Sequence, residues 1–320
     1  MNLIKKKLAI GIPTYKRPKK LIRLLEILKH EIFRCQIQHQ IQIIISDNSE
    51  DSFTENVMSE FDSAGLDLSY FKQPTNIGAD KNYYYLYEKC LAEYIWFISD
   101  DDIPLQESIS KILQALVSAV PDVLLFSFIQ PPGSPIRQFN YGNELEILTE
   151  NIKIVESILT YPKISIYVIK KVEFSQSQID LLLSVSGHGW LFLYISLHVI
   201  QNSNLPRVAI YSEALASSDA EYNHIWVPDP FLHWYKISMH PFIQKNYPAI
   251  EKKMRTQGYL QCILFSWALK KGTHSLDDKK GLDLFIKNLK WDYKILIVRP
   301  KIFLRFLLLK LNLVSLFNRM

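Results

Sequence analysis

The chain has 320 residues, of which 48% are hydrophobic, and its formal net charge is +5. This length allows one large domain or two smaller ones, and the apolar fraction suffices for a sizeable core. The three cysteines are odd in number and widely separated, which excludes a disulfide framework and a cysteine metal site and fits a reducing cytoplasm. We find no internal repeat, no low-complexity tract, no signal-peptide-like stretch before the first strand and nothing that suggests a nucleic-acid partner.

The first predicted strand covers residues 8–15 and runs into a loop. Pro18 follows near the start of a helix, where its missing N–H costs little. Leucines spaced three and four residues apart give this helix an apolar face. A second strand, rich in β-branched residues, covers residues 41–45 and ends in the polar turn 46–49.

Basic residues crowd the start of the first predicted helix, where they oppose the helix dipole. The crowding predicts either a bound anion, such as a diphosphate or anionic lipid, or a solvated basic surface. The residues are Lys16, Arg17, Lys19 and Lys20.

A third strand covers residues 68–71, and the polar segment 74–82 leads into a helix at about 83–91. The fourth strand, 94–98, completes a βαβαβαβ order, which is typical of a parallel sheet with helices on both faces. The loops at the carboxyl ends of parallel strands converge on one edge of the sheet, where such sheets bind their ligands.

Three consecutive carboxylates, Asp100, Asp101 and Asp102, follow this fourth strand, and Pro104 is expected to end it. Adjacent like charges repel each other. A divalent cation relieves that repulsion, and hard oxygen ligands suit Mg²⁺ or Mn²⁺. The alternative is that these acids lie at the N-terminus of a helix over residues 107–118, where they favour the helix dipole without a metal.

Later segments have weaker patterns. We predict a strand at 121–128, a proline-rich loop at 131–135, a helix at 143–160 and a strand at 164–169. The C-terminal segment 295–320 mixes apolar and basic residues without the unbroken apolar run that spans a bilayer. It fits a basic amphipathic helix in the interface of an anionic membrane, or else a helix packed on protein.

Four short motifs, in this order, resemble a family 2 glycosyltransferase of the GT-A fold. Within that group the chain resembles bacterial enzymes of O-antigen and surface-polysaccharide synthesis, including the abequosyltransferase-like branch. The motifs are Ile12–Tyr15, Ser46–Ser49, Asn76–Gly78 with Asp80–Asn82, and Ser99–Asp102. The resemblance implies an α/β fold with a mostly parallel sheet. It further implies a catalytic domain over 1–225, with a nucleotide-sugar half to about 130, and a helical C-terminal region over 226–320.

The resemblance also implies roles for single residues. Pro13, Thr14 and Tyr15 would line the pocket of the nucleotide base, and Asp47 would accept a hydrogen bond from the base or ribose. Asp80 and Lys81 would lie near the ribose and diphosphate. The remaining donor-binding residues would be Asn76, Gly78, Asp100 and Asp101, and the metal ligands would be Asp100 and Asp102, the outer residues of an Asp-X-Asp motif.

The catalytic base departs from the family pattern. Inverting members carry an acid after the acceptor-side strands, but residues 181–212 contain no carboxylate. His188, between two glycines, is one candidate, because a histidine pKa near neutrality suits general base work. Asp180 is the alternative, and a purely structural role for His188 also remains open.

These features favour a metal-dependent glycosyltransferase that uses a nucleotide-diphosphate sugar donor. Its acceptor would be a glycan, expected to be linked to polyprenyl diphosphate, at the cytoplasmic face of the bacterial inner membrane. Two other functions remain open: a nucleotidyltransferase and an inactive homologue that only binds nucleotide-sugar. A nucleotidyltransferase would need a glycine-rich basic loop after the first strand, and Pro13–Lys16 is not one.

Overall fold

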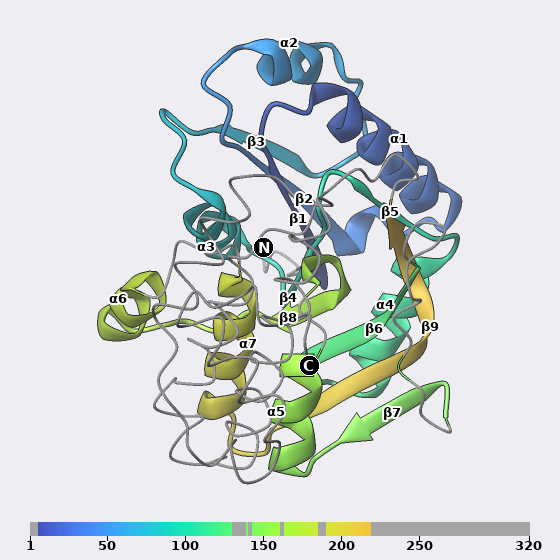
Figure 1. Ribbon diagram of the computed structural model, residues 1–320. Helices are drawn as coiled ribbons and strands as arrows, with labels where there is room; N and C mark the ends of the chain where they lie inside the picture. The colour runs from blue at the N-terminus through green and yellow to red at the C-terminus, as the bar shows by residue number, and fades with distance from the viewer. Residues whose placement is uncertain (1–5, 130–138, 140–142, 161–162, 185–189, 219–320) are drawn as a thin grey trace, which may run out of the picture. The chain divides into compact units, whose positions relative to one another are not determined.

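The computed structural model describes residues 6–129, 139, 143–160, 163–184 and 190–218 (Figure 1). All of them belong to the first of two compact units, Met1–Tyr222 and Asn223–Met320. The C-terminal region 226–320, with the tail predicted to be amphipathic, lies outside the described residues, and so does His188. Within the described part of the chain, no helix is long and apolar enough to cross a membrane.

The first half of the unit alternates strands and helices, as the sequence predicts. Strand β1 lies between β2 and β4, with β3 outside β2, and all three pairings are parallel. The elements are β1 (Leu8–Thr14), α1 (Pro18–Arg34), a short 3₁₀ helix (Gln38–Gln40), β2 (Ile41–Asp47), α2 (Phe53–Glu60), β3 (Leu68–Lys72), α3 (Ala79–Lys89) and β4 (Tyr94–Phe97).

The second half extends the same sheet to nine strands in the order β3-β2-β1-β4-β8-β6-β9-β5, and β7 also pairs with β9. Strands β6 and β9 run with the first four, whereas β5, β7 and β8 run against them. The mostly parallel α/β fold is therefore confirmed. The elements are β5 (Asp102–Pro104), α4 (Ser108–Ser118), β6 (Val123–Ile129), β7 (Leu145–Leu148), α5 (Asn151–Thr160), a 3₁₀ helix (Ile164–Ile166), β8 (Tyr167–Lys170), α6 (Gln176–Ser184), α7 (Leu191–Asn202) and β9 (Val208–Ser218).

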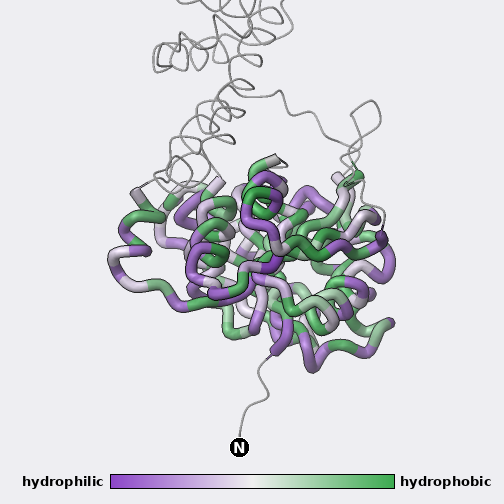
Figure 2. The backbone as a smooth tube through the Cα atoms, turned by 90° about the horizontal axis from the view of Figure 1, so that it is seen from below, coloured by the Kyte–Doolittle hydropathy of each residue, from purple (hydrophilic) through white to green (hydrophobic). Residues whose placement is uncertain are grey.

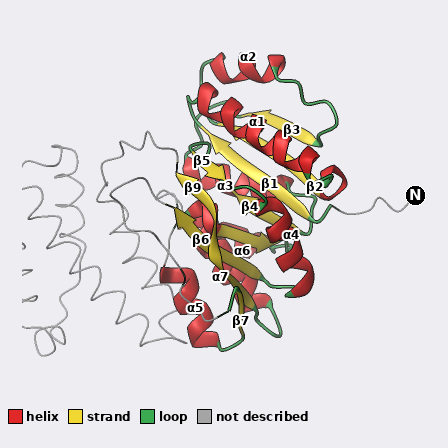
Figure 3. Cartoon of the chain, turned by 90° about the vertical axis from the view of Figure 1, so that its right-hand side faces the viewer, coloured by secondary structure: helices red, strands yellow, loops and turns green. Residues whose placement is uncertain are grey.

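Helices cover both faces of the sheet. Helices α1 and α2 contact each other on one face, and α3 and α7 contact each other on the opposite face (Figures 1 and 3). The leucines predicted to form the apolar face of α1 are all buried. Strands β1, β2 and β4 are therefore buried almost throughout, which explains why they are continuous apolar runs rather than alternating ones. Figure 2 shows how hydrophobic and hydrophilic stretches follow one another along the backbone of this unit.

Three local predictions are wrong. The segment 143–160 is not one helix, because Leu145–Leu148 pairs with β9 before α5 begins. Residues 164–166 form a 3₁₀ turn ahead of β8. Pro104 does not simply end β4: it belongs to β5, a short edge strand, which tolerates a residue without an N–H. In each case a partner distant in sequence overrides the local pattern.

The sheet also defines where a ligand can bind. After β1 the chain moves outward to β2 and β3, and then returns to place β4 on the other side of β1. This reversal of direction opens a crevice at the carboxyl ends of β1 and β4.

Candidate active site

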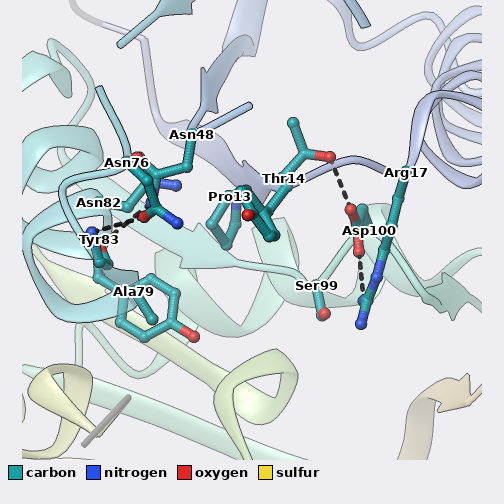
Figure 4. A pocket seen from close by; sticks show the side chains of 12 residues that line it. Pro13, Thr14, Arg17, Asn48, Asn76, Ala79, Asn82, Tyr83, Ser99 and Asp100 are labelled. Carbon is teal, nitrogen blue, oxygen red and sulfur yellow. Dashed lines mark hydrogen bonds and ion pairs between the residues drawn. The ribbon is translucent and has the colours of Figure 1, made fainter. Parts of the chain in front are cut away.

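A pocket of about 340 Å³ lies at the carboxyl ends of β1, β2 and β4 (Figure 4). It is within the size range of small-molecule sites. Its lining residues come from these three strand ends, from the loop that leads into α3 and from the start of α3. They are Pro13, Thr14, Tyr15, Arg17, Asn48, Asn76, Gly78, Ala79, Asn82, Tyr83, Ser99 and Asp100.

The loop after β1 is held by hydrogen bonds to the loop after β2. The backbone N–H of Asn48 donates to the carbonyl of Thr14 at 2.9 Å. Lys16 has a φ of 54°, in the left-handed region, and its N–H donates to Ser49 Oγ at 2.8 Å. This sharp turn makes Arg17 the residue that precedes α1, with its side chain in the lining of the pocket.

One side of the pocket is neutral and rich in amides. Asn48 Nδ2 donates to the Gly78 carbonyl at 3.2 Å, and the Gly78 N–H donates to Asn76 Oδ1 at 2.9 Å. Gly78 has a φ of +81°, which favours glycine at this turn. Asn82 Nδ2 donates to the Ser46 carbonyl at 3.0 Å, while its buried Oδ1 has no hydrogen-bond partner among the described residues.

The other side of the pocket carries charge. Asp100 accepts hydrogen bonds from Thr14 Oγ1 at 2.7 Å and from Arg17 Nη1 at 3.0 Å (Figure 4). The same Arg17 nitrogen donates to Asp101 at 2.9 Å, and Ser99 Oγ donates to Asp101 at 2.6 Å. One guanidinium therefore bridges two carboxylates from the loop after β4.

The third carboxylate has a different cation. Lys163 Nζ lies 3.0 Å from Asp102 Oδ1 and 2.9 Å from Asp102 Oδ2. Ser165 Oγ also donates to Asp102 Oδ2. Ser165 is fixed in turn, because its carbonyl accepts from Trp96 Nε1 at 2.9 Å and its hydroxyl accepts from the N–H of Ser99 at 3.1 Å.

Burial shifts the titration of these acids. It raises the pKa of Asp100 to about 6, against the lowering effect of Thr14 and Arg17. Burial also raises the pKa of Asp102, and Lys163 and Ser165 only partly oppose this. For Asp101, burial is outweighed by Ser99, Lys163 and Arg17, so its pKa is lowered. The three neighbouring acids thus differ in how readily they ionise.

Two of the four basic residues at the start of α1, Lys16 and Arg17, pair with acids of the same unit. Arg17 pairs with Asp100 and Asp101, and Lys16 Nζ lies 3.1 Å from Glu50. The acids do not act on the dipole of α4 either, because that helix begins only at Ser108 and has no acid in its first turn. They instead form a charged cluster with cations from α1 and from the segment before β8.

This arrangement does not fit a divalent metal as it stands. Arg17 and Lys163 already contact the three carboxylates, and Asp102 is only 1% exposed. Within the described residues, no group of three or more His, Cys, Asp or Glu side chains is placed to hold a metal ion. The expected ligand pair, Asp100 and Asp102, is therefore divided between two different protein cations.

Six of the ten donor-binding residues suggested by the resemblance line the pocket. Pro13, Thr14, Tyr15, Asn76, Gly78 and Asp100 are in its lining, whereas Asp47, Asp80, Lys81 and Asp101 are not. Asp47 is fully buried and accepts from the Ser49 N–H, from Ser49 Oγ and from Tyr70 Oη. Its contact with a nucleotide stays a prediction.

Two other predicted residues lie in or beside α3. Asp80 is buried and accepts from the N–H of Leu191 at 2.8 Å, so it caps α7 from the first turn of α3. Lys81 is exposed beside it. Asp180, the alternative catalytic base, is exposed on α6 and accepts from Gln176 Nε2 at 2.9 Å. The described structure does not bring Asp180 into the lining of the pocket.

Sequence reasoning did not select Arg17, Lys163, Asn82 or Tyr83 as site residues. Asn82 lies inside a quoted motif, and the basic cluster at the start of α1 pointed to a nearby anion. No local sequence pattern predicts the contact between Lys163 and Asp102, because the two residues are 61 positions apart. That contact depends on the pairing of β4 with β8.

Solved structures share this fold at low sequence identity. A crystal structure of S. aureus TarS has a TM-score of 0.61 at 15% identity and covers 89% of this chain, but this chain covers only 49% of it. A shorter TarS chain, solved with UDP-GlcNAc, has a TM-score of 0.61 at 17% identity, covering 88% of this chain and 81% of that one.

The mannosyltransferase PcManGT from Pyrobaculum calidifontis, in complex with GDP-Man and Mn²⁺, has a TM-score of 0.55 at 11% identity. It covers 96% of this chain, and 87% of its own chain is covered. We found no sequence match among curated proteins.

The sequence itself matches a family model. The model of glycosyl transferase family 2 covers residues 9–170, from the second residue of β1 to the end of β8, and includes every residue that lines the pocket. This chain therefore belongs to glycosyl transferase family 2.

Proposed function

We propose that this protein transfers a sugar from a nucleoside diphosphate donor to a glycan acceptor, and that the donor binds in the pocket between β1, β2 and β4. The observation that carries the proposal is the division of this pocket into an amide side and a charged side. A nucleotide-sugar has the same division, with a neutral base and ribose at one end and a diphosphate further along.

The neutral side has groups suited to a nucleoside. Tyr83 offers an aromatic ring, and Asn48 and Asn76 offer amides that can donate and accept hydrogen bonds. Solved neighbours of the same fold carry UDP, UDP-GlcNAc or GDP-Man. These names support a nucleotide-sugar donor for this chain without choosing its base.

The charged side suits the leaving group. When the glycosidic bond breaks, negative charge builds up on the diphosphate, and a preorganised cation in the pocket stabilises it. Arg17 lines the pocket and would supply that positive charge by exchanging its bonds to Asp100 and Asp101 for bonds to the diphosphate. The donor-free site does not fit Mg²⁺ or Mn²⁺, but such an ion would add a second neutralising charge if it bound together with the donor. The Mn²⁺ in the complex of PcManGT supports keeping this metal in the proposal.

The acceptor hydroxyl must lose a proton to a base. His188 and Asp180 remain the candidates, and the exposed position of Asp180 on α6 makes His188 the first to test. Replacing His188 with Ala should lower turnover by about 10²-fold while donor affinity is kept. Near-normal turnover in that variant would direct the search to Asp180.

We further propose a lipid-linked acceptor in surface-polysaccharide synthesis, with the enzyme peripheral on the cytoplasmic face of the inner membrane. The support is the mixed apolar and basic sequence of residues 295–320. Binding of the full chain to anionic liposomes should increase with anionic lipid and decrease with salt. If the protein ignores such liposomes, this part of the proposal is wrong. The abequosyltransferase-like branch stays a prediction.

A thermal-shift panel tests the donor proposal. The full chain is heated with UDP-, GDP-, CDP- and dTDP-sugars, because a ligand that binds only the folded state raises the melting temperature. We expect one nucleotide class to stabilise the protein and its sugar to be transferred to a glycan acceptor. Stabilisation without transfer to any acceptor would favour an inactive homologue, and no stabilisation by any donor would contradict the proposal.

A further inference from the structure

The pair formed by Asp102 and Lys163 has the geometry of a filled cation site. The ammonium lies within 3.0 Å of both carboxylate oxygens of Asp102, so it takes the position between them. Asp102 is only 1% exposed, and Ser165 occupies one of the same oxygens. A metal ion could reach this carboxylate only by displacing Lys163.

Lys163 is held where it lies. Its Nζ is 4.7 Å from the centre of the Phe128 ring on β6, and its side chain is 20% exposed. The turn that follows it is fixed to the end of β4, because Ser165 bonds to Trp96 and Ser99. A lysine packed over an aromatic ring and against a buried acid is a fixed part of the structure rather than a surface charge.

The charges of the cluster support the same conclusion. Three carboxylates face two protein cations: Arg17 forms ion pairs with Asp100 and Asp101, and Lys163 forms one with Asp102. The lysine ammonium and a divalent cation would both bind the same buried carboxylate oxygens, so they compete for them. Removing the lysine leaves an uncompensated buried charge, which attracts another cation.

We propose that Lys163 is the resident counter-ion of Asp102 and that it sets the metal requirement of this site by excluding divalent cations from Asp102 in the donor-free protein. The inference deepens the proposed function, on which it rests for its biological meaning. Its test uses neither donor nor acceptor, so its failure is distinguishable from a failure of glycosyl transfer.

The experiment measures Mn²⁺ binding to the full chain by electron paramagnetic resonance, in which bound Mn²⁺ loses the signal of the free ion. The protein is tested as wild type, Lys163→Met, Lys163→Arg and the double variant Asp102→Asn/Lys163→Met. Lys153→Met, which changes an exposed lysine on α5 that pairs with Glu150, is the matched control.

We expect Lys163→Met to bind one Mn²⁺ at least about tenfold more tightly than the wild type does. Mn²⁺ should also raise the melting temperature of that variant only. Lys163→Arg and Lys153→Met should behave as the wild type, and the double variant should lose the gain because the carboxylate is gone.

Equal Mn²⁺ affinity in the wild type and in Lys163→Met would overturn the proposal. If Lys163→Met does not fold, comparison of the wild type with Asp102→Asn still decides. Tight Mn²⁺ binding by the wild type that Asp102→Asn abolishes would show that the metal displaces Lys163 easily, and the proposal would be wrong. Weak binding that is equal in the two proteins is the expected result.

Discussion

The ends of β2 and β4 lie on either side of β1, and both present buried aspartates, yet their partners differ in kind. Asp47, at the end of β2, is held by neutral donors, two of them from Ser49 and one from Tyr70. Asp100, after β4, is held by Thr14 and by the cation Arg17. The same sequence pattern, an apolar strand followed by an acid, therefore produces two different environments.

The difference shows what each strand end is suited to do. Neutral donors from Ser49 and from Tyr70 on β3 hold Asp47, which does not line the pocket. Cations from distant segments build a charged cluster whose bonds can be exchanged for bonds to an anionic ligand. We therefore expect the cations bound to the carboxylates after β4, and no group at the end of β2, to stabilise negative charge on a bound ligand.

The largest effect should come from breaking the pair at the end of β4. Asp102→Ala or Lys163→Met should lower the free energy of unfolding by about 3 kcal/mol, because each leaves a buried charge without its partner. The double variant Asp102→Asn/Lys163→Met should recover most of this loss. Urea denaturation measures all of these free energies.

The matched control is the exposed pair of Lys72 and Glu55, 2.8 Å apart. Lys72→Met should cost less than about 1 kcal/mol. Equal losses in the buried and exposed pairs would show that Asp102 and Lys163 do not form a desolvated pair.

We also expect Asp102→Ala to abolish sugar transfer. Full activity in that variant would show that Asp102 has no role in the active site.

A second prediction concerns pH. Because burial raises the pKa of Asp100 to about 6, the folded protein binds a proton there that the unfolded chain, with its lower pKa, releases. The contribution of Asp100 to stability is therefore highest below the unfolded pKa of about 4 and falls as pH rises through 6. The expected loss is on the order of 3 kcal/mol.

The measurement compares the wild type with Asp100→Asn by urea denaturation from pH 4 to pH 7.5. The free energy of unfolding of the wild type, relative to the variant, should fall over this range, because asparagine does not titrate. A difference that is constant or that rises with pH would mean that Arg17 and Thr14 outweigh burial at Asp100.

A smaller effect is expected at the end of β2. Asp47→Asn should lower the free energy of unfolding by about 1.5–3 kcal/mol, since hydrogen bonds to a charged group are lost. Tyr70→Phe, which removes a single donor to the same carboxylate, should cost about 1 kcal/mol. Donor affinity decides the role of Asp47: a loss of affinity in Asp47→Asn that Tyr70→Phe does not share would show contact with the nucleotide, as the resemblance implies.

Local patterns in the sequence predicted the first half of the fold well. Each strand from β1 to β4 is a short apolar run ended by polar residues, and a few neighbouring positions suffice to recognise it. Local patterns failed where a strand pairs with a segment distant in sequence, as Leu145–Leu148 and Asp102–Pro104 do with β9. The same reason explains the site. Asp100 could be placed at a strand end from sequence, but Lys163 comes to Asp102 only through tertiary structure.

The most direct test asks whether Arg17 binds the diphosphate of a donor. Calorimetric titration should compare a nucleoside diphosphate with its nucleoside on the wild type, Arg17→Gln and Lys19→Gln, where Lys19 is an exposed cation at the same helix end. We expect Arg17→Gln to weaken diphosphate binding by about tenfold, or about 1.4 kcal/mol, and to leave nucleoside binding unchanged. Lys19→Gln should change neither. Equal losses for nucleoside and diphosphate, or no loss in Arg17→Gln, would contradict the central claim that the charged side of this pocket binds the leaving group.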